Sequence, residues 1–505
     1  MRPTSQKTNS IFLAAFLTVL FTGSAAVLYA QNAGALDSTF GVEGIITAYI
    51  NNKETVKGSA VQADGKIVIA GYTNIDSNSL YDDFLVARYN TDGSPDITFG
   101  VNGIVLTDFG HSYDEGAAVV IQSDGKIIVA GTTGKPDSLN KDFALARYND
   151  NGELDTTFGQ EGRVITDFAK SGDYGTAVAI QTDGKILIAG STENLVTLQF
   201  DYGVVRYDSI GRVDSSFSDR GRVRADFKSR DDICNGIVIM DDGSIIVGGM
   251  TVKNFNGSDF SIAKIKPNGT FDSTFGDGGK NTIDVKKYDF GNALAYAGFA
   301  NKILLAGTTT DGADLTKFLV LRIKGDGTLD SSFGEQGQVL TALGPKSYCN
   351  SIAVQSDNKM ILAGRSVSNV DLSSVAMERL FGDGKVDSAF GQNGQVITKF
   401  GTINSVAYSV SLQTDGKIIV AGKSFIAGGN GIGMARLNSN GSLDNSFDSD
   451  GKLVYTISFV YFDQPNAIAL KNGKIYIAGY SKNIAGNMDF SVAKLNADGS
   501  FDAGF

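Results

Sequence analysis

Histidine, cysteine and proline are scarce in this chain of 505 residues, and each shortage excludes a class of protein. The one histidine is His111, so a Ser-His-Asp triad or a histidine-based metal site would have to use it. We interpret it as a solvated loop residue. Cys234 and Cys349 are too few for a disulfide scaffold. Six prolines leave no proline-rich linker, and we expect no second folded domain.

The first thirty residues differ from everything that follows. Arg2 and Lys7 form a basic start, and Ile11–Phe21 is almost entirely apolar. Small residues then offer cleavage sites after Ala26 or Ala30. This pattern is typical of a secretory signal peptide. The alternative is a membrane anchor, because apolar residues continue to the end of the segment.

Export has consequences for charge and location. We predict a signal peptide at 1–30 and a mature chain of 31–505 that is secreted or displayed on the cell surface. No later stretch is long enough to span a bilayer. The net charge of −11 becomes −13 when the two basic residues of the signal are removed. An acidic surface repels phosphate backbones, so we expect no nucleic-acid partner.

A short motif, Asp-x-x-Phe, recurs along the chain at intervals of 57 to 59 residues. It is usually preceded by Leu or Val and followed by Gly. A fixed period of this length indicates an array of structural repeats. The motif aspartates are Asp37, Asp96, Asp155, Asp214, Asp272, Asp330, Asp387, Asp444 and Asp502.

Each interval contains four short apolar runs rich in Val, Ile, Phe and Tyr and bounded by turn residues, which predicts four strands. An Asp-Gly pair between the second and third runs favours a β-hairpin. No segment after the first thirty residues has sustained helical periodicity. In the second repeat the runs are Ile104–Thr107, Ala118–Gln122, Ile127–Gly131 and Phe143–Tyr148.

The third run determines the architecture because it does not alternate apolar with polar residues. Continuous apolar runs such as Ile186–Ala189 indicate burial on both faces of the sheet. A four-stranded unit achieves this when other sheets pack on both sides. We therefore predict an all-β, eight-bladed β-propeller with four antiparallel strands per blade. The alternative is a stacked β-solenoid, which needs atypical caps that the sequence lacks. The ninth motif copy leaves the ring closure open. Residues 36–40 and 501–505 are equivalent, and both could fill the one place between the last repeat and the first.

The repeat resembles the delta-60 repeat family. The resemblance covers residues 36–505 and rests on Leu154–Gly159, Asp183–Gly190 and Asp142–Tyr148, which recur in this form through the chain. It implies a bacterial secreted or surface β-propeller without a common enzymatic activity or active site. The chain has no tryptophan, no WD dipeptide and no kelch Gly-Gly signature. Single repeats depart from the motifs at Ser218, Ser244, Lys317 and Asn358.

A basic residue ends every fourth run, and we predict that it bonds the motif aspartate at each blade junction. The aspartate can also cap a single helical turn. Because both residues recur in every repeat, we interpret them as structural. The basic residues are Arg88, Arg147, Arg206, Lys264, Arg322, Arg379, Arg436 and Lys494.

Metal and cofactor sites are not predicted. The segment Asn90–Asp96 has oxygen side chains at a spacing that calcium loops use. It lacks the final glutamate of an EF-hand, and Asn-x-Asp-Gly is ordinary turn chemistry. We therefore interpret the segment as a turn.

Residues that vary between repeats are the better candidates for function. They lie in the loops between the first and second runs and between the third and fourth, which should share one face of the ring. Tyrosine beside aspartate in the first set of loops suggests a glycan or protein ligand, held by stacking and hydrogen bonds. The alternative is that each tyrosine packs on its own blade. The candidate ligand-binding residues are Tyr113, Asp114, Asp173, Tyr174, Tyr288, Asp289 and Tyr348.

Two functions remain open from the sequence. The first is a secreted, non-catalytic binding or scaffold propeller, monomeric, with an extracellular glycan or protein as its partner. The second is an extracellular hydrolase or lyase that acts on polysaccharide through paired carboxylates, which need no histidine. Its acids would be Asp114, Asp173, Asp232 and Asp289, facing one another across the central channel.

Overall fold

The fold is taken from a computed structural model. The chain divides into two units, Met1–Gln31 and Asn32–Phe505, and all described residues belong to the second. The predicted signal peptide, His111, Asp37 and Asp502 lie outside the described residues. The described ranges are 45–48, 53–74, 82–90, 95–110, 113–134, 140–168, 172–228, 231–253, 257–297, 301–312, 315–370, 372–401, 404–413, 415–426, 429–445, 452–455, 463–471, 474–482 and 488–495.

Strands of the described residues pair antiparallel in eight groups of four, which confirms the predicted fold, and single parallel residue pairs link some neighbouring groups. From the inside of each sheet outward, the strands belong to four classes. The innermost are β2 (Lys53–Val61), β6 (Glu115–Ile121), β10 (Asp173–Ile180), β14 (Asp232–Ile239), β18 (Tyr288–Ala297), β22 (Lys346–Val354), β26 (Ser405–Leu412) and β30 (Asp463–Lys471). The second are β3 (Ile67–Asn74), β7 (Ile127–Gly134), β11 (Ile186–Asn194), β15 (Ile245–Lys253), β19 (Lys302–Thr310), β23 (Met360–Val367), β27 (Ile418–Ile426) and β31 (Lys474–Lys482). The third are β4 (Asp82–Tyr89), β8 (Lys141–Tyr148), β12 (Gln199–Tyr207), β16 (Gly257–Ile265), β20 (Thr316–Ile323), β24 (Ser373–Leu380), β28 (Gly429–Leu437) and β32 (Met488–Leu495). The outermost are β5 (Ile104–Thr107), β9 (Arg163–Thr166), β13 (Arg222–Ala225), β17 (Lys280–Ile283), β21 (Gln338–Thr341), β25 (Gln395–Thr398), β29 (Lys452–Tyr455) and β1 (Ile45–Ala48).

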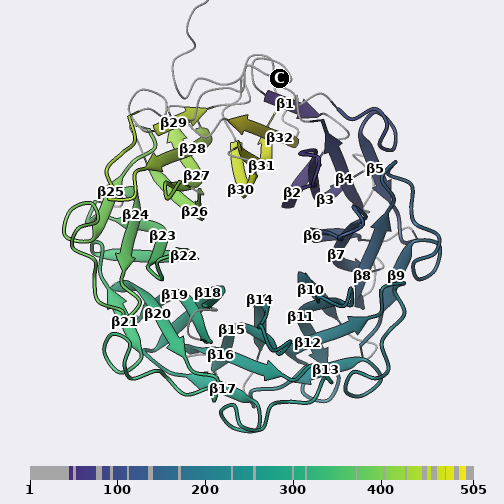
Figure 1. The fold of residues 1–505 in the computed structure, drawn as a ribbon, viewed down its shortest axis with the longest axis horizontal. Helices are drawn as coiled ribbons and strands as arrows, with labels where there is room; N and C mark the ends of the chain where they lie inside the picture. The colour runs from purple at the N-terminus through teal and green to yellow at the C-terminus, as the bar shows by residue number, and fades with distance from the viewer. Residues whose placement is uncertain are drawn as a thin grey trace, which may run out of the picture. The chain divides into compact units, whose positions relative to one another are not determined.

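The sheets are the blades of a closed ring. The innermost strand of each blade contacts that of the next, and β30 contacts β2. Figure 1 shows these strands around the centre of the ring. The eighth blade takes its outermost strand from the other end of the chain, because β1 pairs antiparallel with β32, with Ile45 opposite Ala493. This pairing provides the closure that the sequence left open. Each sequence repeat is therefore one strand out of step with a blade: its first strand is the outer strand of the blade before.

The second strand of each blade is buried, as its continuous apolar sequence predicts. Every residue of β7 is buried, and so is every residue of β4 in the third class. The core lies between blades: Val68 and Phe84 of the first blade pack with Ile127 of the second. Such contacts cover both faces of each sheet, so no alternation with polar residues is needed. None of the described residues forms a helix long and apolar enough to cross a membrane.

Candidate functional site

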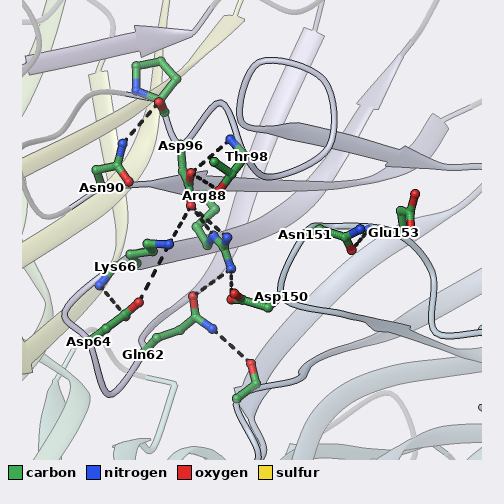
Figure 2. A network of polar contacts seen from close by, with 12 residues as sticks. Gln62, Asp64, Lys66, Arg88, Asn90, Asp96, Thr98, Asp150, Asn151 and Glu153 are labelled. Carbon is green, nitrogen blue, oxygen red and sulfur yellow. Dashed lines mark hydrogen bonds and ion pairs between the residues drawn. The ribbon is translucent and has the colours of Figure 1, made fainter.

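The recurring motif forms a structure that holds blades together. In the first blade, the buried Arg88 places its guanidinium 2.8 Å from Asp96 Oδ2 and donates to Asp150 of the second blade at 2.6 Å. Its guanidinium also lies 4.6 Å from the centre of the Phe99 ring. Figure 2 shows Arg88 between these carboxylates and beside Gln62, which donates to the Gly125 carbonyl of the second blade at 3.0 Å.

The same set recurs around the ring. We call the basic residue, the motif Asp and Phe, and the following residue (usually Gly) the blade clasp, and the side of the ring on which it lies the clasp face. Its ion pairs are Arg88–Asp96 at 2.8 Å, Arg147–Asp155 at 2.8 Å, Arg206–Asp214 at 3.0 Å, Lys264–Asp272 at 3.1 Å, Arg322–Asp330 at 3.0 Å, Arg379–Asp387 at 2.8 Å and Arg436–Asp444 at 2.7 Å. The eighth pair includes Asp502 and lies outside the described residues.

The clasp crosses to the next blade through backbone groups. Arg147 donates to the Ser209 carbonyl, and Gly159 N donates to the Ile210 carbonyl at 2.8 Å. Gly159 has φ of +55°, the left-handed conformation that suits glycine. The local turn is a β-turn and not the expected helical turn, because Phe158 N donates to the Asp155 carbonyl three residues back. The aspartate still caps it, since Thr157 N donates to Asp155 Oδ1 at 3.0 Å.

Charge and hydrogen bonds keep the clasp aspartates ionised. Burial alone would raise the pKa of Asp96, but hydrogen bonds from Thr98 and Lys66 and the charge of Arg88 lower it to about 2. The pKa of Asp330 is also lowered to about 2, by bonds from Ser332 and the Arg322 charge acting against burial. Seven pairs of this kind make the clasp a structural device, because a catalytic group is needed once.

The variable loops lie on the opposite face. Tyr113 N donates to the Gly134 carbonyl at 2.6 Å, and Asp114 N donates to the Asp82 carbonyl of the first blade at 2.8 Å. The loop before an innermost strand therefore meets the loops between second and third strands of two adjacent blades. We call the side of the ring on which these loops lie the loop face.

The seven candidate ligand-binding residues occupy three different positions on that face. Asp114, Asp173 and Asp289 have no exposed surface. Each accepts bonds from a threonine hydroxyl and from loop backbone; Phe109 N, for example, donates to Asp114 Oδ2 at 2.8 Å. Neighbouring strand residues point to opposite sides, so the tyrosine and the aspartate of one pair cannot both face a ligand. The three aspartates do not form a rim for a ligand.

The tyrosines are more accessible and fall into two classes. Tyr113 and Tyr288 precede the buried aspartate, and lysines lie over their rings at 4.2 Å and 5.1 Å. Tyr174 and Tyr348 follow the buried position at equivalent places on β10 and β22. Tyr174 is 40% exposed and packs edge-on against Phe200 at 5.5 Å. The second class therefore lies within the innermost strands, one residue beyond the buried position.

Sequence reasoning missed that three aspartates gather at each of four successive blade junctions. Their carboxylate oxygens lie within 4.8 Å of one another. One aspartate comes from the third strand, one follows the outer strand, and one begins the next innermost strand. The clusters are Asp83, Asp108 and Asp114; Asp142, Asp167 and Asp173; Asp201, Asp226 and Asp232; and Asp259, Asp284 and Asp289.

These junctions favour bound protons. Burial, with the nearby charges of other aspartates, raises the pKa of Asp142 to about 6 and those of Asp173 and Asp232 to about 7. Carboxylates are ligands that calcium accepts, but calcium takes about six to eight oxygens, and each innermost aspartate already accepts backbone bonds. At the fourth junction, Lys253 Nζ lies 2.6 Å from Asp259 and 2.7 Å from Asp284, so a lysine already supplies positive charge.

The next two junctions have no acid at these three positions. The residues there are Lys317, Ala342 and Ser347 at one junction and Ser374, Lys399 and Ser405 at the other. The buried serines take over the aspartate's role: Leu343 N donates to Ser347 Oγ at 2.9 Å, and Phe400 N donates to Ser405 Oγ at 3.0 Å.

A hollow of about 380 Å³ opens over the innermost strands of these same blades. Its lining includes three aromatic residues, Phe290 on β18, Tyr348 on β22 and Tyr408 on β26, together with Arg365 on β23. Asn292 and Asn350, which form bulges in β18 and β22, also line it and donate to the next blade's backbone at 2.8 Å and 2.7 Å. The volume is within the usual range for small-molecule sites, about 300–1,000 Å³.

Three larger or similar hollows recur at equivalent places between the outer strands of neighbouring blades. They follow the loops that contain Phe109, Phe168 and Phe227. Because these three hollows recur at equivalent places, we attribute them to the way neighbouring blades pack. The hollow over β18, β22 and β26 instead uses positions that differ from blade to blade, so we take it as the candidate ligand site.

Sequence reasoning found Tyr348 but missed Phe290, Tyr408 and Arg365. These residues could have been found by aligning the repeats of the chain with one another. The position of Arg365 holds Thr132, Ser191 and Thr308 in other blades, as strand register shows. Comparison of equivalent positions, residue by residue, would have shown that the residue varies and that two adjacent blades have a cation here, Arg365 and Lys423.

Two further features that the sequence singled out are the cysteines and the calcium-like segment. Cys234 and Cys349 are free and buried in β14 and β22, which lie two blades apart, and burial raises their pKa values to about 12. Of the calcium-like segment Asn90–Asp96, residues 91–94 lie outside the described residues, and Asp96 belongs to the clasp.

The geometry defines an eight-bladed β-propeller. The chain belongs to the family described as "Domain of unknown function (DUF5122) beta-propeller". Eight segments match the family, each ending at a clasp phenylalanine: 62–99, 122–158, 181–217, 241–275, 301–333, 355–390, 413–447 and 470–505. No curated protein matches the chain.

Solved structures show the same fold at low sequence identity. Sqt1 from Chaetomium thermophilum, bound to the N-terminus of the ribosomal protein L10, is 9% identical with a TM-score of 0.50, over 89% of this chain and 98% of that one. The polysaccharide lyase Uly1 is 11% identical with a TM-score of 0.46, over 90% and 99%. These similarities concern the fold alone.

Proposed function

We propose that this chain is a secreted, non-catalytic β-propeller that binds an extracellular glycan or protein through the hollow over β18, β22 and β26. The observation that carries the proposal is the gathering of Phe290, Tyr348 and Tyr408 around one hollow, at positions whose residue varies between blades. Phe290 is 36% exposed, so its ring is accessible to a ligand. Aromatic rings beside amide groups are suited to stacking and hydrogen bonding with a ligand.

The same proposal includes secretion of the protein and its placement in a narrower repeat family. The basic and then apolar first thirty residues support a signal peptide. The three recurring motifs support placement within the bacterial delta-60 repeats. A rigid ring with binding residues at one face agrees with a protein that works outside the cell as a receptor or scaffold.

The alternative of a carboxylate-dependent hydrolase or lyase has less support. It requires Asp114, Asp173, Asp232 and Asp289 to face one another, whereas each is buried in a separate junction. Among the described residues, none that lines the hollow is acidic. We therefore do not propose catalysis.

A glycan array probed with the purified protein, combined with an assay for released reducing ends, tests the proposal. We expect retention of one class of glycan without release of product. Time-dependent release that scales with protein concentration would overturn the non-catalytic assignment. A Tyr348→Ala variant should lose retention, and an Arg212→Ala variant, changed in an exposed turn of the clasp face, should keep it.

A further inference from the structure

We propose that the hollow over β18, β22 and β26 binds an acidic sugar of an anionic polysaccharide, and that Arg365 binds its carboxylate or sulfate group. This ligand class rests on the proposed binding function and makes it more specific. Four observations support it. Arg365 stands at a position that varies between blades, it lacks an acidic partner among the described residues, aromatic residues surround it, and the nearby backbone carbonyls already accept hydrogen bonds.

Arg365 occupies a strand position whose residue varies around the ring. Tyr72, Met250 and Lys423 stand there in other blades, and in three blades the residue is a threonine or serine. At equivalent positions, Thr132 accepts from Gly175 N at 3.0 Å, and Thr308 accepts from Cys349 N at 3.0 Å. These hydroxyls bond the innermost strand of the following blade. Arginine at this point gives up that bond, while Asn350 holds the junction by donating to the Ala407 carbonyl at 2.7 Å. An arginine at this variable position therefore has no evident structural benefit.

The guanidinium of Arg365 is available to a ligand. It lies 4.3 Å from the centre of the Tyr348 ring, and among the described residues no carboxylate or carbonyl accepts a hydrogen bond from it. The clasp arginines differ, because each is bonded to an aspartate. In a chain of net charge −11, an arginine without an acidic partner, in a hollow whose described lining has no acid, is a selective site for an anion. Its planar fork matches carboxylate and sulfate geometry.

The surroundings favour a sugar over a peptide. Phe290, Tyr348 and Tyr408 present aromatic surface to the hollow, and such surface stacks on the apolar face of a sugar ring. A peptide that adds as a strand needs free backbone carbonyls at the edge of the innermost strands. At this place the Cys349 and Ala407 carbonyls already accept from Asn292 and Asn350.

The test compares an acidic polysaccharide with its neutral counterpart on the purified protein. Isothermal titration would use polygalacturonate, carboxyl-reduced polygalacturonate and a sulfated galactan. We expect binding of at least one anionic polymer, weakening as salt is added, and binding of the neutral polymer about tenfold or more weaker. The carboxylate and sulfate polymers identify which anion is preferred, and either preference supports the proposal.

Variants make the test specific to Arg365. Arg365→Thr restores the residue found at the equivalent position of Thr308 and should weaken anionic binding about tenfold or more without lowering the melting temperature. Arg365→Lys should recover part of the loss. Arg212→Thr makes the same chemical change in an exposed turn on the clasp face and should bind normally.

Two outcomes separate this inference from the proposed function. If the neutral polymer binds as well as the acidic one and Arg365→Thr is unaffected, the acidic ligand class is wrong and glycan binding stands. If no glycan binds in the array or by titration, while a peptide library yields a ligand, the sugar inference is wrong and the broader binding function stands.

Discussion

The clasp face and the loop face use aspartate in opposite ways. On the clasp face each described motif aspartate lies beside a buried cation, and the pKa of Asp96 falls to about 2. On the loop face aspartates lie beside one another, and the pKa of Asp232 rises to about 7. One residue type therefore gives a permanent ion pair or a proton-binding site, depending on its neighbours. The clasp recurs in seven described blades, whereas the acidic clusters occupy four junctions.

The largest effect is expected from breaking a clasp. Asp155→Ala leaves the buried Arg147 without its carboxylate and removes the cap of the turn. We expect the free energy of unfolding to fall by about 3–5 kcal/mol, which is the usual loss when a buried ion pair is broken. Cap loss alone would be about 0.5–2 kcal/mol. Urea denaturation of the variant and the parent measures the difference.

A matched variant separates charge from geometry in the clasp. Arg147→Lys keeps the positive charge and reproduces the lysine that Lys264 supplies naturally. Its loss of stability should be well under that of Asp155→Ala. Equal losses in the two variants would mean that the planar guanidinium, with its bond to the Ser209 carbonyl, contributes as much as the carboxylate of Asp155.

The second effect is a dependence of stability on pH that comes from the loop face. Asp142, Asp173 and Asp232 have raised pKa values of about 6, 7 and 7, whereas an unfolded aspartate loses its proton near about pH 3.9. Between these values the folded protein binds more protons than the unfolded chain, so stability falls as pH rises. Each raised carboxylate can contribute up to about 1.4 kcal/mol per pH unit below its pKa, but solvent screening and the sharing of one junction by Asp142 and Asp173 reduce the sum. We expect a loss of about 1–3 kcal/mol from about pH 5 to about pH 8.

The clasp face should give the opposite slope in acid. Its aspartates have lowered pKa values, so their contribution is present above about pH 4 and is lost as the pH falls toward about 2. Stability should therefore be greatest at about pH 4–5. Urea denaturation in EDTA, which removes competing cations, gives the profile. No change between the mildly acid and mildly basic points would contradict the raised pKa values.

The ring offers its own replacement for an acidic cluster. The triple change Asp201→Ser, Asp226→Lys and Asp232→Ser gives the third junction the residues of Ser374, Lys399 and Ser405. The serine at the innermost strand can keep the loop bond, as Ser405 does. We expect the slope above about pH 5 to become shallower by about 1 kcal/mol, with the folded structure retained. An unchanged slope would place the proton uptake at the other junctions.

The fold was predictable because its determinants are local and repeated. The Ile127–Ala130 run, the Asp-Gly turn and the motif Asp155 have counterparts in nearly every repeat, so period and apolar pattern led to eight four-stranded blades. The pairing of β1 with β32 was not predictable, since two equivalent segments at opposite ends of the chain could each have filled the same place in the ring. Pairing of β1 with the last blade is a contact between opposite ends of the chain.

The candidate site was less predictable because it depends on side-chain direction across blades. Tyr348 could be selected from sequence, but Asp114 and Asp173 were assigned to a rim from which the strand pleat turns them away. Arg365 became visible only when the register aligned it with Thr308. The matched family segments agree with this division, since they cover the clasps and leave out most of the innermost strands.

The smallest effect concerns which tyrosines contact a ligand. Tyr348→Ala with Tyr408→Ala removes two rings of the hollow and should weaken polygalacturonate binding by about 1 kcal/mol or more. Tyr113→Ala with Tyr174→Ala removes two rings elsewhere on the same face and should leave that binding nearly unchanged. Both pairs should melt close to the parent, because all four side chains are at least partly exposed. If the second pair loses binding and the first keeps it, the ligand lies over the acidic blades and the hollow is not its site.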